Sequence, residues 1–199
     1  MVTHYFTDNR HLPQERKTIE FRFWGFHVLF VTDAGVFSRD KVDYGSELLL
    51  RHLDLEHMEG MILDVGCGYG VIGVSVSLAC PNAQVHMIDV NDRAIELANL
   101  NAKANKASAE AFKSHAFEMV ESDYNHIITN PPIRAGKAVV YEIFEGAYAH
   151  LKDGGVLWVV IRKQQGAESA ITKIKSLFHN CTVVVKDKGY FVLKAIKSN

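Results

Sequence analysis

The chain has 199 residues, of which 48% are hydrophobic and 23% charged, with 22 Lys and Arg against 23 Asp and Glu. This length predicts one domain, or one domain with a small extension, and the composition excludes collagen-like, proline-rich and disordered proteins. No apolar run approaches the ~18 residues of a membrane helix, and the polar first ten residues lack a secretory signal. The three scattered cysteines predict neither a disulfide framework nor a zinc site, so we expect a cytoplasmic protein.

The near-zero net charge conceals an uneven distribution along the chain. Residues 61–130 hold 4 basic and 8 acidic side chains, a net charge of −4, whereas residues 131–199 hold 11 basic and 5 acidic ones, a net charge of +6. An acidic middle suits a cationic ligand, and a basic C-terminal third suits a polyanion such as nucleic acid. Solvated helix faces would give the same charges and are the alternative explanation.

The first predicted element is a β-hairpin over residues 18–32, with a turn at Trp24-Gly25, and a helix over 45–53 follows. From residue 61 strands and helices alternate. Strands are predicted at 61–65, 85–89, 111–113, 126–129 and 156–161, helices at 71–80, 91–105, 137–151 and 167–178, a turn at Gly154-Gly155, and a final hairpin of 181–186 and 190–196. This alternation predicts an open, mostly parallel α/β sheet whose ligands bind at the carboxyl ends of the strands.

A glycine-rich turn, Gly66-Cys67-Gly68-Tyr69-Gly70, follows the first strand of this alternation and leads into a helix. Glycines allow a ligand to approach the backbone closely, and a helix N-terminus favours negative charge on that ligand. Residues 68–73 match the dinucleotide fingerprint, with Asp89 as its ribose acid. The same turn, read from Asp64, also matches the pattern of S-adenosylmethionine (SAM) sites. Pattern matching alone leaves both cofactors open.

Charge favours SAM at this turn. We expect Asp64 at the mouth of the turn, where its carboxylate would repel a pyrophosphate but attract the sulfonium and ammonium groups of SAM. Asp89, at the end of the next strand, can accept hydrogen bonds from both ribose hydroxyls with either cofactor. Cys67 has no His near it in sequence, so we expect a packed residue rather than a nucleophile.

The motif Asn130-Pro131-Pro132-Ile133 follows the fourth strand, which an α/β sheet places beside the first. An exocyclic amine is a poor nucleophile because its lone pair is delocalised into the ring. The Asn130 side-chain oxygen and the Pro131 carbonyl can accept its two N–H bonds and direct the lone pair at a methyl group. The two prolines restrict the backbone, and Ile133 can pack on the target group. The predicted catalysis relies on orientation and preorganised dipoles, without a covalent intermediate.

These residues resemble the class I SAM-dependent methyltransferases of the small-domain family, which include ribosomal RNA guanine-N2 methyltransferases. The resemblance covers about residues 30–199, and the segment 131–137 is similar to compact stand-alone bacterial members. It implies a Rossmann-like α/β fold: a mostly parallel seven-stranded sheet with an antiparallel last strand and helices on both faces. We therefore expect residues 1–34 to form an N-terminal extension with the β-hairpin and residues 35–199 to form the methyltransferase domain. The residues that carry the likeness are Gly35–Ser38, Asp43–Ser46, Ile62–Gly70, Ile88–Asn91 and Asn130–Ile133.

The resemblance also implies a role for each group of site residues. Its cofactor site comprises Asp64, Gly66, Cys67, Gly68, Gly70, Asp89, Val90, His115, Ala116 and Asn130. In it the glycine turn would hold the methionine part of SAM, Asp89 the ribose and the loop after the third strand the adenine. The residues Asp43–Ser46 would flank the methionine end or the substrate mouth. Substrate-facing residues would be Phe37, Ser38, Arg134, Lys137, Arg162 and Lys163, the last four as phosphate ligands or, alternatively, as ordinary solvated charges.

The sequence thus predicts a SAM-dependent N-methyltransferase that acts in ribosomal RNA methylation and processing, on guanine N2. The partner would be ribosomal RNA or a ribosomal subunit, with no membrane. The ten histidines show no ligand spacing, so no metal is implied. The alternatives are a protein glutamine N5-methyltransferase, a small-molecule amine methyltransferase, and an inactive SAM- or RNA-binding module.

Overall fold

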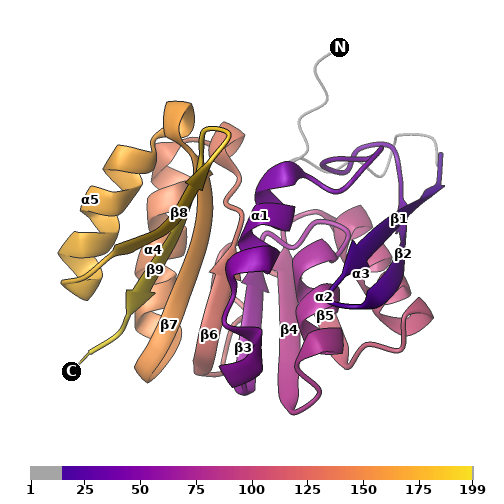
Figure 1. Cartoon of the computed structure of the whole chain (residues 1–199), viewed down its shortest axis with the longest axis horizontal. Helices are drawn as coiled ribbons and strands as arrows, with labels where there is room; N and C mark the ends of the chain where they lie inside the picture. Colours follow the sequence, from indigo (N-terminus) through magenta and orange to yellow (C-terminus); the bar gives the residue numbers. More distant parts are fainter. Residues whose placement is uncertain (1–14, 199) are drawn as a thin grey trace.

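A seven-stranded sheet in the order β5-β4-β3-β6-β7-β9-β8 forms the centre of the computed structural model, which describes residues 15–198 (Figure 1). Five neighbouring strands are parallel, and β9 is antiparallel to both β7 and β8, as predicted. The strands are β3 (Gly60–Val65), β4 (Ala83–Asp89), β5 (Ala109–Lys113), β6 (Tyr124–Thr129), β7 (Leu151–Arg162), β8 (Thr182–Asp187) and β9 (Tyr190–Ile196). The pairing of β3 with β6 brings the glycine turn and the Asn-Pro-Pro motif to the same edge of the sheet.

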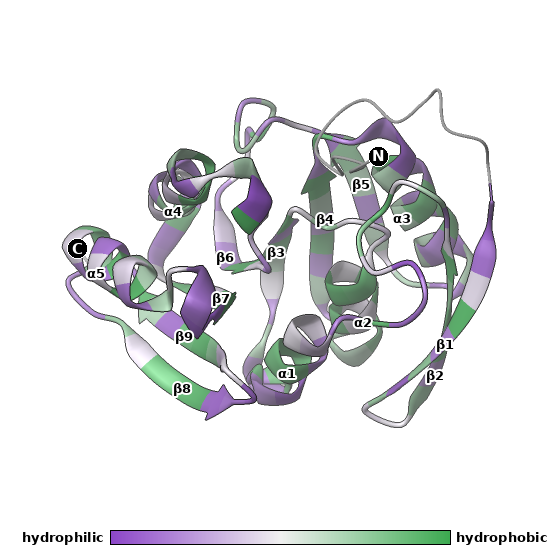
Figure 2. Ribbon diagram, turned by 90° about the horizontal axis from the view of Figure 1, so that it is seen from above, coloured by the Kyte–Doolittle hydropathy of each residue, from purple (hydrophilic) through white to green (hydrophobic). Residues whose placement is uncertain are grey.

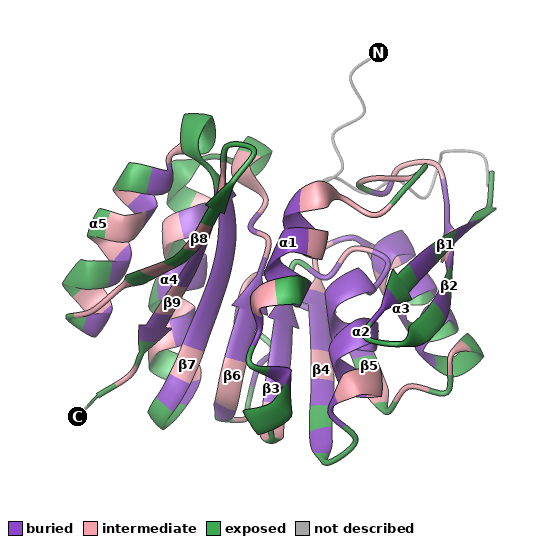
Figure 3. Cartoon of the chain, viewed as in Figure 1, coloured by how far each residue is buried: buried purple, intermediate pink, exposed green. Residues whose placement is uncertain are grey.

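Helices cover both faces of the sheet (Figure 2). One face packs on α1 (Tyr44–His52), α2 (Val71–Ala79) and α3 (Asp92–Ala104), and the other on α4 (Lys137–His150) and α5 (Ala167–Phe178). Successive strand residues alternate between these faces, so Ile62 packs in the first core and Leu63 in the second. The central strands are therefore buried over most of their length (Figure 3). Three short 3-10 helices, η1 (Leu55–His57), η2 (Ile133–Ala135) and η3 (Lys163–Gln165), complete the fold.

The predicted N-terminal hairpin is present, as β1 (Lys17–Phe23) and β2 (Phe26–Thr32) joined by the turn at Trp24-Gly25. Its apolar face, which includes Phe21 and Phe30, belongs to the same buried cluster as α2 and α3. The division at residue 34 between extension and domain stays a prediction. Its outer limits, residues 1–14 and residue 199, lie outside the described residues.

Two asparagines of α3 pair with the outer edge of β2. Asn101 accepts from the Val31 N–H at 2.7 Å and donates to the Val31 carbonyl at 3.0 Å, and Asn105 makes the same pair with Leu29 at 3.2 and 2.8 Å. One helical turn advances about 5.4 Å and two strand residues about 6.6 Å, so the two spacings match closely enough for both pairs. These amides attach the hairpin to the helix.

One local prediction is wrong. The pair Gly154-Gly155 is not a turn before a strand, because β7 runs from Leu151 to Arg162. Its pairing with β6 shifts register between Tyr124 and His126, and the Gly154 N–H donates to the Lys197 carbonyl at 2.8 Å. The glycines therefore form an irregularity inside a long strand, bonded to the chain beyond β9. None of the helices between residues 15 and 198 has the length and apolar character needed to cross a membrane.

Candidate active site

A cavity of about 320 Å³ opens at the carboxyl ends of the parallel strands, where the topology predicts ligand binding. Each strand contributes the residues that follow it. The cavity is lined by Gly66–Tyr69 after β3, Asp89–Asn91 at the end of β4, Ser114–Ala116 after β5, Asn130–Arg134 after β6, Arg162 at the end of β7 with Gln165 beyond it, and Tyr190 of β9. Residues 36–38, Asp43 and Ser46 also line it. Apolar side chains complete the wall: Val65, Val71, Ile72, Ile88, Ala94, Val139 and Ile143.

The glycine turn presents bare backbone to this cavity. Gly66 and Gly68 have positive φ values of 75° and 56°. The turn is held from behind, because the N–H groups of Gly66 and Cys67 donate to the Ile88 carbonyl at 2.9 and 3.0 Å. A Cβ built on Gly68 would meet no atom of the described part of the chain within 4 Å, so the space beside this residue is open to a ligand. Gly70 does not line the cavity but stands directly before α2.

Asp89 lies in the cavity with both carboxylate oxygens oriented by the backbone. Its Oδ2 accepts from the Gly68 N–H at 2.9 Å and its Oδ1 accepts from the Asn91 N–H at 2.9 Å. Burial raises the pKa of this carboxyl, and the N–H groups of Asn91, Gly68 and Val90 oppose the rise. Each oxygen retains lone-pair capacity, so Asp89 can accept from two ribose hydroxyls.

The structure corrects the predicted position of Asp64. The side chain is only 1% exposed and does not line the cavity, because it points beneath the turn toward α2. Its Oδ2 accepts from the Gly73 N–H at 2.9 Å, and its buried Oδ1 has no hydrogen-bond partner among residues 15–198. Desolvation raises the pKa of Asp64 to about 7. The expected placement at the mouth of the turn is wrong, because the Asp64 carboxylate is bonded to α2 and does not reach the cavity.

Cys67 lines the cavity as a buried side chain. Burial, with smaller contributions from the charges of Asp89 and Asp64, raises the pKa of its thiol well above the ordinary value. A thiol that resists ionisation is a poor nucleophile, in agreement with the packing role expected from the sequence.

Asn130 lines the cavity, and the hydrogen bonds of its amide define its orientation. The Nδ2 group donates to Asp43 Oδ2 at 3.1 Å and to Ser46 Oγ at 3.0 Å. The amide oxygen is thereby left available to the cavity. The Pro131 carbonyl accepts from the Ile133 N–H at 2.9 Å and retains one lone pair, while η2 turns the chain away after Pro132. The two acceptors predicted from the sequence thus stand on adjacent residues of the wall.

The far end of the cavity is formed by Val90, Ser114, His115 and Ala116. The Ser114 hydroxyl donates to the Ala116 carbonyl at 2.8 Å, and the Ser114 N–H donates to the Asp89 carbonyl at 3.0 Å, so this loop is attached to β4. His115 Nδ1 lies 3.8 Å from Glu118 and 3.7 Å from Glu142. The loop expected to contact adenine therefore borders the same cavity as Asp89.

The side of the cavity formed by β7 and β9 carries aromatic and cationic side chains. In the sheet these strands lie on the other side of β6 from β3, β4 and β5, whose loops form the expected cofactor site. Arg162 stacks over the ring of Tyr190 at 4.8 Å on this side. Phe37, which is 50% exposed, lines the cavity from the loop before α1, in which the Gly35 carbonyl accepts from Asn91. Arg134 also lines the cavity. Lys137 and Lys163 do not, although they are exposed residues that begin α4 and η3 just outside it.

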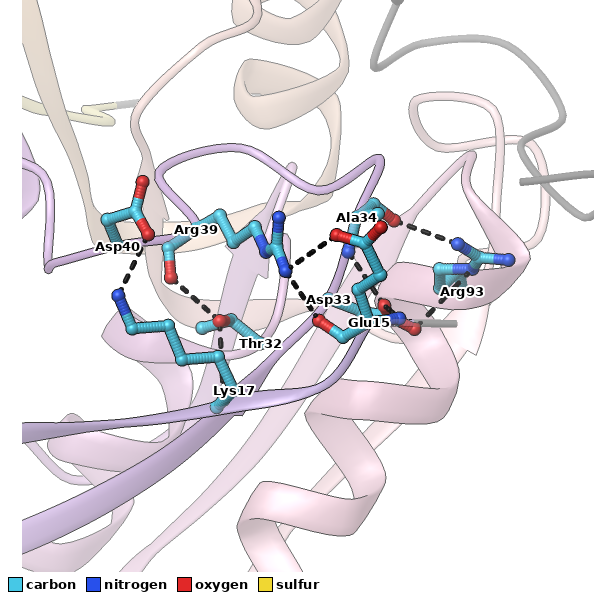
Figure 4. Close-up of polar contacts among 8 residues, drawn as sticks. All are labelled: Glu15, Lys17, Thr32, Asp33, Ala34, Arg39, Asp40 and Arg93. Carbon is cyan, nitrogen blue, oxygen red and sulfur yellow. Dashed lines mark hydrogen bonds and ion pairs between the residues drawn. The ribbon is translucent and has the colours of Figure 1, made fainter. Parts of the chain in front are cut away.

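The loop that carries Phe37 and Ser38 is anchored at its base (Figure 4). The buried Asp33 carboxylate accepts from the Ala34 N–H at 2.7 Å and lies 3.9 Å from the guanidinium of Arg93, which donates to the Ala34 carbonyl at 2.9 Å. The Thr32 hydroxyl donates to the Arg39 carbonyl at 2.7 Å. These contacts connect both ends of the loop to the hairpin and α3.

Sequence reasoning missed Tyr190 and Gln165 as wall residues, and it placed Asp43 and Ser46 near the site without seeing their contact with Asn130. The hairpin turn between β8 and β9 could have predicted that Tyr190, which follows it, lies near the site. Because β8 is aligned with the parallel strands, the residues that follow it reach the same edge of the sheet.

The residues present fit SAM. The open space beside Gly68 would accommodate a ligand against the backbone, and Asp89 offers oriented acceptors for a ribose. Gly66–Gly68 would hold the methionine part and His115 and Ala116 would border the adenine. Among residues 15–198 no group of three or more His, Cys, Asp or Glu side chains could hold a metal ion.

Comparisons with known proteins identify the family. The profile of the methyltransferase small domain matches residues 27–194. The uncharacterized Bacillus subtilis protein YbxB is 46% identical over 99% of this chain and 100% of its own length. The ribosomal RNA large subunit methyltransferase G of Streptomyces coelicolor is 33% identical over 84% of the chain, and the ribosomal RNA small subunit methyltransferase C of Klebsiella pneumoniae is 37% identical over 69%. The chain spans only 45% and 42% of those two enzymes.

The structure also resembles a solved enzyme of this kind. A T. thermophilus 16S rRNA N2 G1207 methyltransferase, in complex with AdoMet (which is SAM) and guanosine, superposes with a TM-score of 0.84 at 28% identity. The likeness covers 94% of this chain and 52% of that one. The predicted fold class is thus confirmed, and SAM is confirmed as the cofactor. The chain belongs to the methyltransferase small domain family and is a SAM-dependent methyltransferase.

Proposed function

We propose that the protein methylates an exocyclic amine of ribosomal RNA, the N2 amine of a guanine. The observation that carries the proposal is the orientation of Asn130, whose Nδ2 is engaged by Asp43 and Ser46 so that its oxygen is the atom available to the cavity. That oxygen and the Pro131 carbonyl make a pair of acceptors, and an amine with two N–H bonds is the group such a pair recognises.

The chain's own residues act by orientation. Acceptance of both N–H bonds by Asn130 and Pro131 draws the nitrogen toward tetrahedral geometry and concentrates its lone pair in one direction. Pro131 and Pro132 restrict the backbone dihedrals of this segment, which keeps the acceptors preorganised. When bound along Gly66–Gly68 and Asp89, SAM would supply an electrophilic methyl group in exchange for one N–H proton of the amine.

RNA as the substrate is supported by charge and by the relatives. Arg134 and Arg162 line the cavity on the side away from Asp89, with Lys137 and Lys163 beyond them, so phosphates on either side of a target base would meet cations. Phe37, which also lines the cavity, offers an exposed ring for a base to contact. The Thermus, Streptomyces and Klebsiella relatives are named as ribosomal RNA methyltransferases, the first of them an N2 enzyme.

The test is methyl transfer from tritium-labelled SAM to ribosomal subunits and free ribosomal RNA prepared from a strain that lacks the gene. We expect label in RNA, and in N2-methylguanosine after digestion to nucleosides. The Asn130→Ala variant should lose transfer while it keeps SAM affinity within about threefold, since Asn130 orients the amine rather than the cofactor. Label in protein fractions or small molecules alone would contradict the proposal.

A further inference from the structure

We infer that Asp43 is a positioning residue that decides which atom of the Asn130 amide faces the cavity; the inference rests on the proposed role of Asn130. The two residues are 87 positions apart in sequence and meet at 3.1 Å, where Asn130 Nδ2 donates to Asp43 Oδ2. The second partner of the same Nδ2 group, Ser46 Oγ, lies at 3.0 Å. Both N–H bonds of the amide thus have partners in one short segment, Asp43–Ser46.

The two partners differ in what they specify. A serine hydroxyl can donate or accept, so Ser46 would satisfy either end of the Asn130 amide. An ionised carboxylate only accepts, so Asp43 tolerates the NH2 end of the amide and disfavours the oxygen end. The discrimination between the two amide orientations therefore comes from Asp43.

Asp43 is itself held in place. It stands directly before α1, where its Oδ2 accepts from the Ser46 N–H at 3.1 Å, and a helix N-terminus favours its negative charge. Gly45 lets the ring of Tyr190 pack against this turn, because an added Cβ would lie 2.8 Å from a Tyr190 ring carbon. A fixed carboxylate is what a positioning role requires.

Reversal of the amide would destroy the acceptor pair. With Asn130 turned over, its NH2 group would face an N–H bond of the substrate amine. Two hydrogen-bond donors would then meet, and the hydrogen bond to Asn130 would be lost. The target amine would then be held by the Pro131 carbonyl alone. We therefore expect the Asp43 carboxylate to control the rate of transfer by way of Asn130.

The test begins with Asp43→Ser, because Asp43 Oδ2 both caps α1 and accepts from Asn130, so an Asn that kept the cap would still present an acceptor to Asn130. A serine hydroxyl keeps the helix-capping ability but can donate or accept, so it no longer discriminates between the two amide orientations. We expect kcat to fall about tenfold or more, while the KM for SAM and the melting temperature stay near the wild-type values. The matched variant Ser46→Ala removes the other partner and leaves the discriminating carboxylate, so its kcat should fall less. A kcat of Asp43→Ser equal to wild type would overturn the inference, as would equal losses in the two variants.

A double substitution provides a rescue. In the double variant Asp43→Ser with Asn130→Asp, the side chain at 130 again turns an oxygen to the cavity, and the Ser46 hydroxyl can donate to its other oxygen. Asn130→Asp alone places two carboxylates together. We expect the double variant to exceed both single variants in kcat by about threefold or more; a double variant no better than either one contradicts the inference.

A spectroscopic readout separates this inference from the proposed function. The Asn130 side-chain NH2 signal, assigned by its loss in Asn130→Ala, should show contacts to the Ser46 β protons in the ¹⁵N-labelled protein without RNA. It should shift and lose those contacts in Asp43→Ser. If the wild type shows this behaviour but methylates no RNA, the proposed function fails and the positioning role stands. If it methylates RNA and the signal is unchanged in Asp43→Ser, the positioning role fails alone.

Discussion

The N–H of Gly68 donates to Asp89 Oδ2 at 2.9 Å, and this bond joins the glycine turn after β3 to the carboxylate at the end of β4. The two motifs that the sequence presents separately are thus one unit. The conformation of the turn and the orientation of the carboxylate depend on each other, so damage to either side should affect the whole cofactor site.

Asp89→Asn is expected to weaken SAM binding by about 100-fold, because an amide offers one acceptor where the carboxylate offers two, and hydrogen bonds to a charged group contribute ~1.5–3 kcal/mol each. Calorimetric titration with SAM checks the affinity. Asp92→Asn, at the exposed partner of Lys113, is the matched control and should bind SAM normally. Equal affinity for wild type and Asp89→Asn would contradict the ribose role.

Gly68→Ala tests the open side of the turn. The backbone there has φ of 56° and the added methyl group would meet no protein atom, so stability should fall by only ~1 kcal/mol while SAM affinity falls by tenfold or more, as an order-of-magnitude expectation. Gly25→Ala carries the same kind of strain in the hairpin turn, with φ of 84° and equally open surroundings. It should lose similar stability and no affinity, as measured by urea unfolding and calorimetry.

Asp64 should make stability depend on pH. Its pKa of about 7 in the folded state exceeds the ordinary value of 3.8. Between these values the folded chain binds the proton more readily than the unfolded chain, so the free energy of unfolding falls as pH rises through this window. Relative to Asp64→Asn, the wild type should lose about 1 kcal/mol per pH unit there. Urea titrations from pH 5 to pH 8 measure both slopes, and parallel slopes would refute the assignment.

Lys137→Glu tests the phosphate contacts beyond the cavity. We expect weaker RNA binding and a dependence of log affinity on log salt that is shallower by about one unit, because one counterion-releasing contact is lost. Lys103→Glu, on an exposed position of α3, makes the same change in net charge away from the cavity and should leave the slope unchanged. The measurement is fluorescence anisotropy with labelled RNA over a salt series.

Local and topological signals explain how much the sequence could predict. The alternation of strands and helices places Asp89 and Asn130 at the same sheet edge, and the structure agrees. The buried position of Asp64 could also have been predicted from the sequence. Residues two places apart in a strand share a face, so Asp64 lies on the same face of β3 as Ile62, and that face packs on α2. Tyr190 and the contact of Asp43 with Asn130 depend on strand order and on pairings distant in sequence, which local patterns do not encode.

The asparagines that bond to Leu29 and Val31 have a consequence for solubility. A two-stranded ribbon normally offers its free edge as a template on which another chain can add a strand, the first step toward aggregation. Here side-chain amides already occupy donors and acceptors of that edge, so a competing strand would have to displace them. Loss of Asn101, which is fully buried, should therefore favour intermolecular β-pairing before the domain itself unfolds.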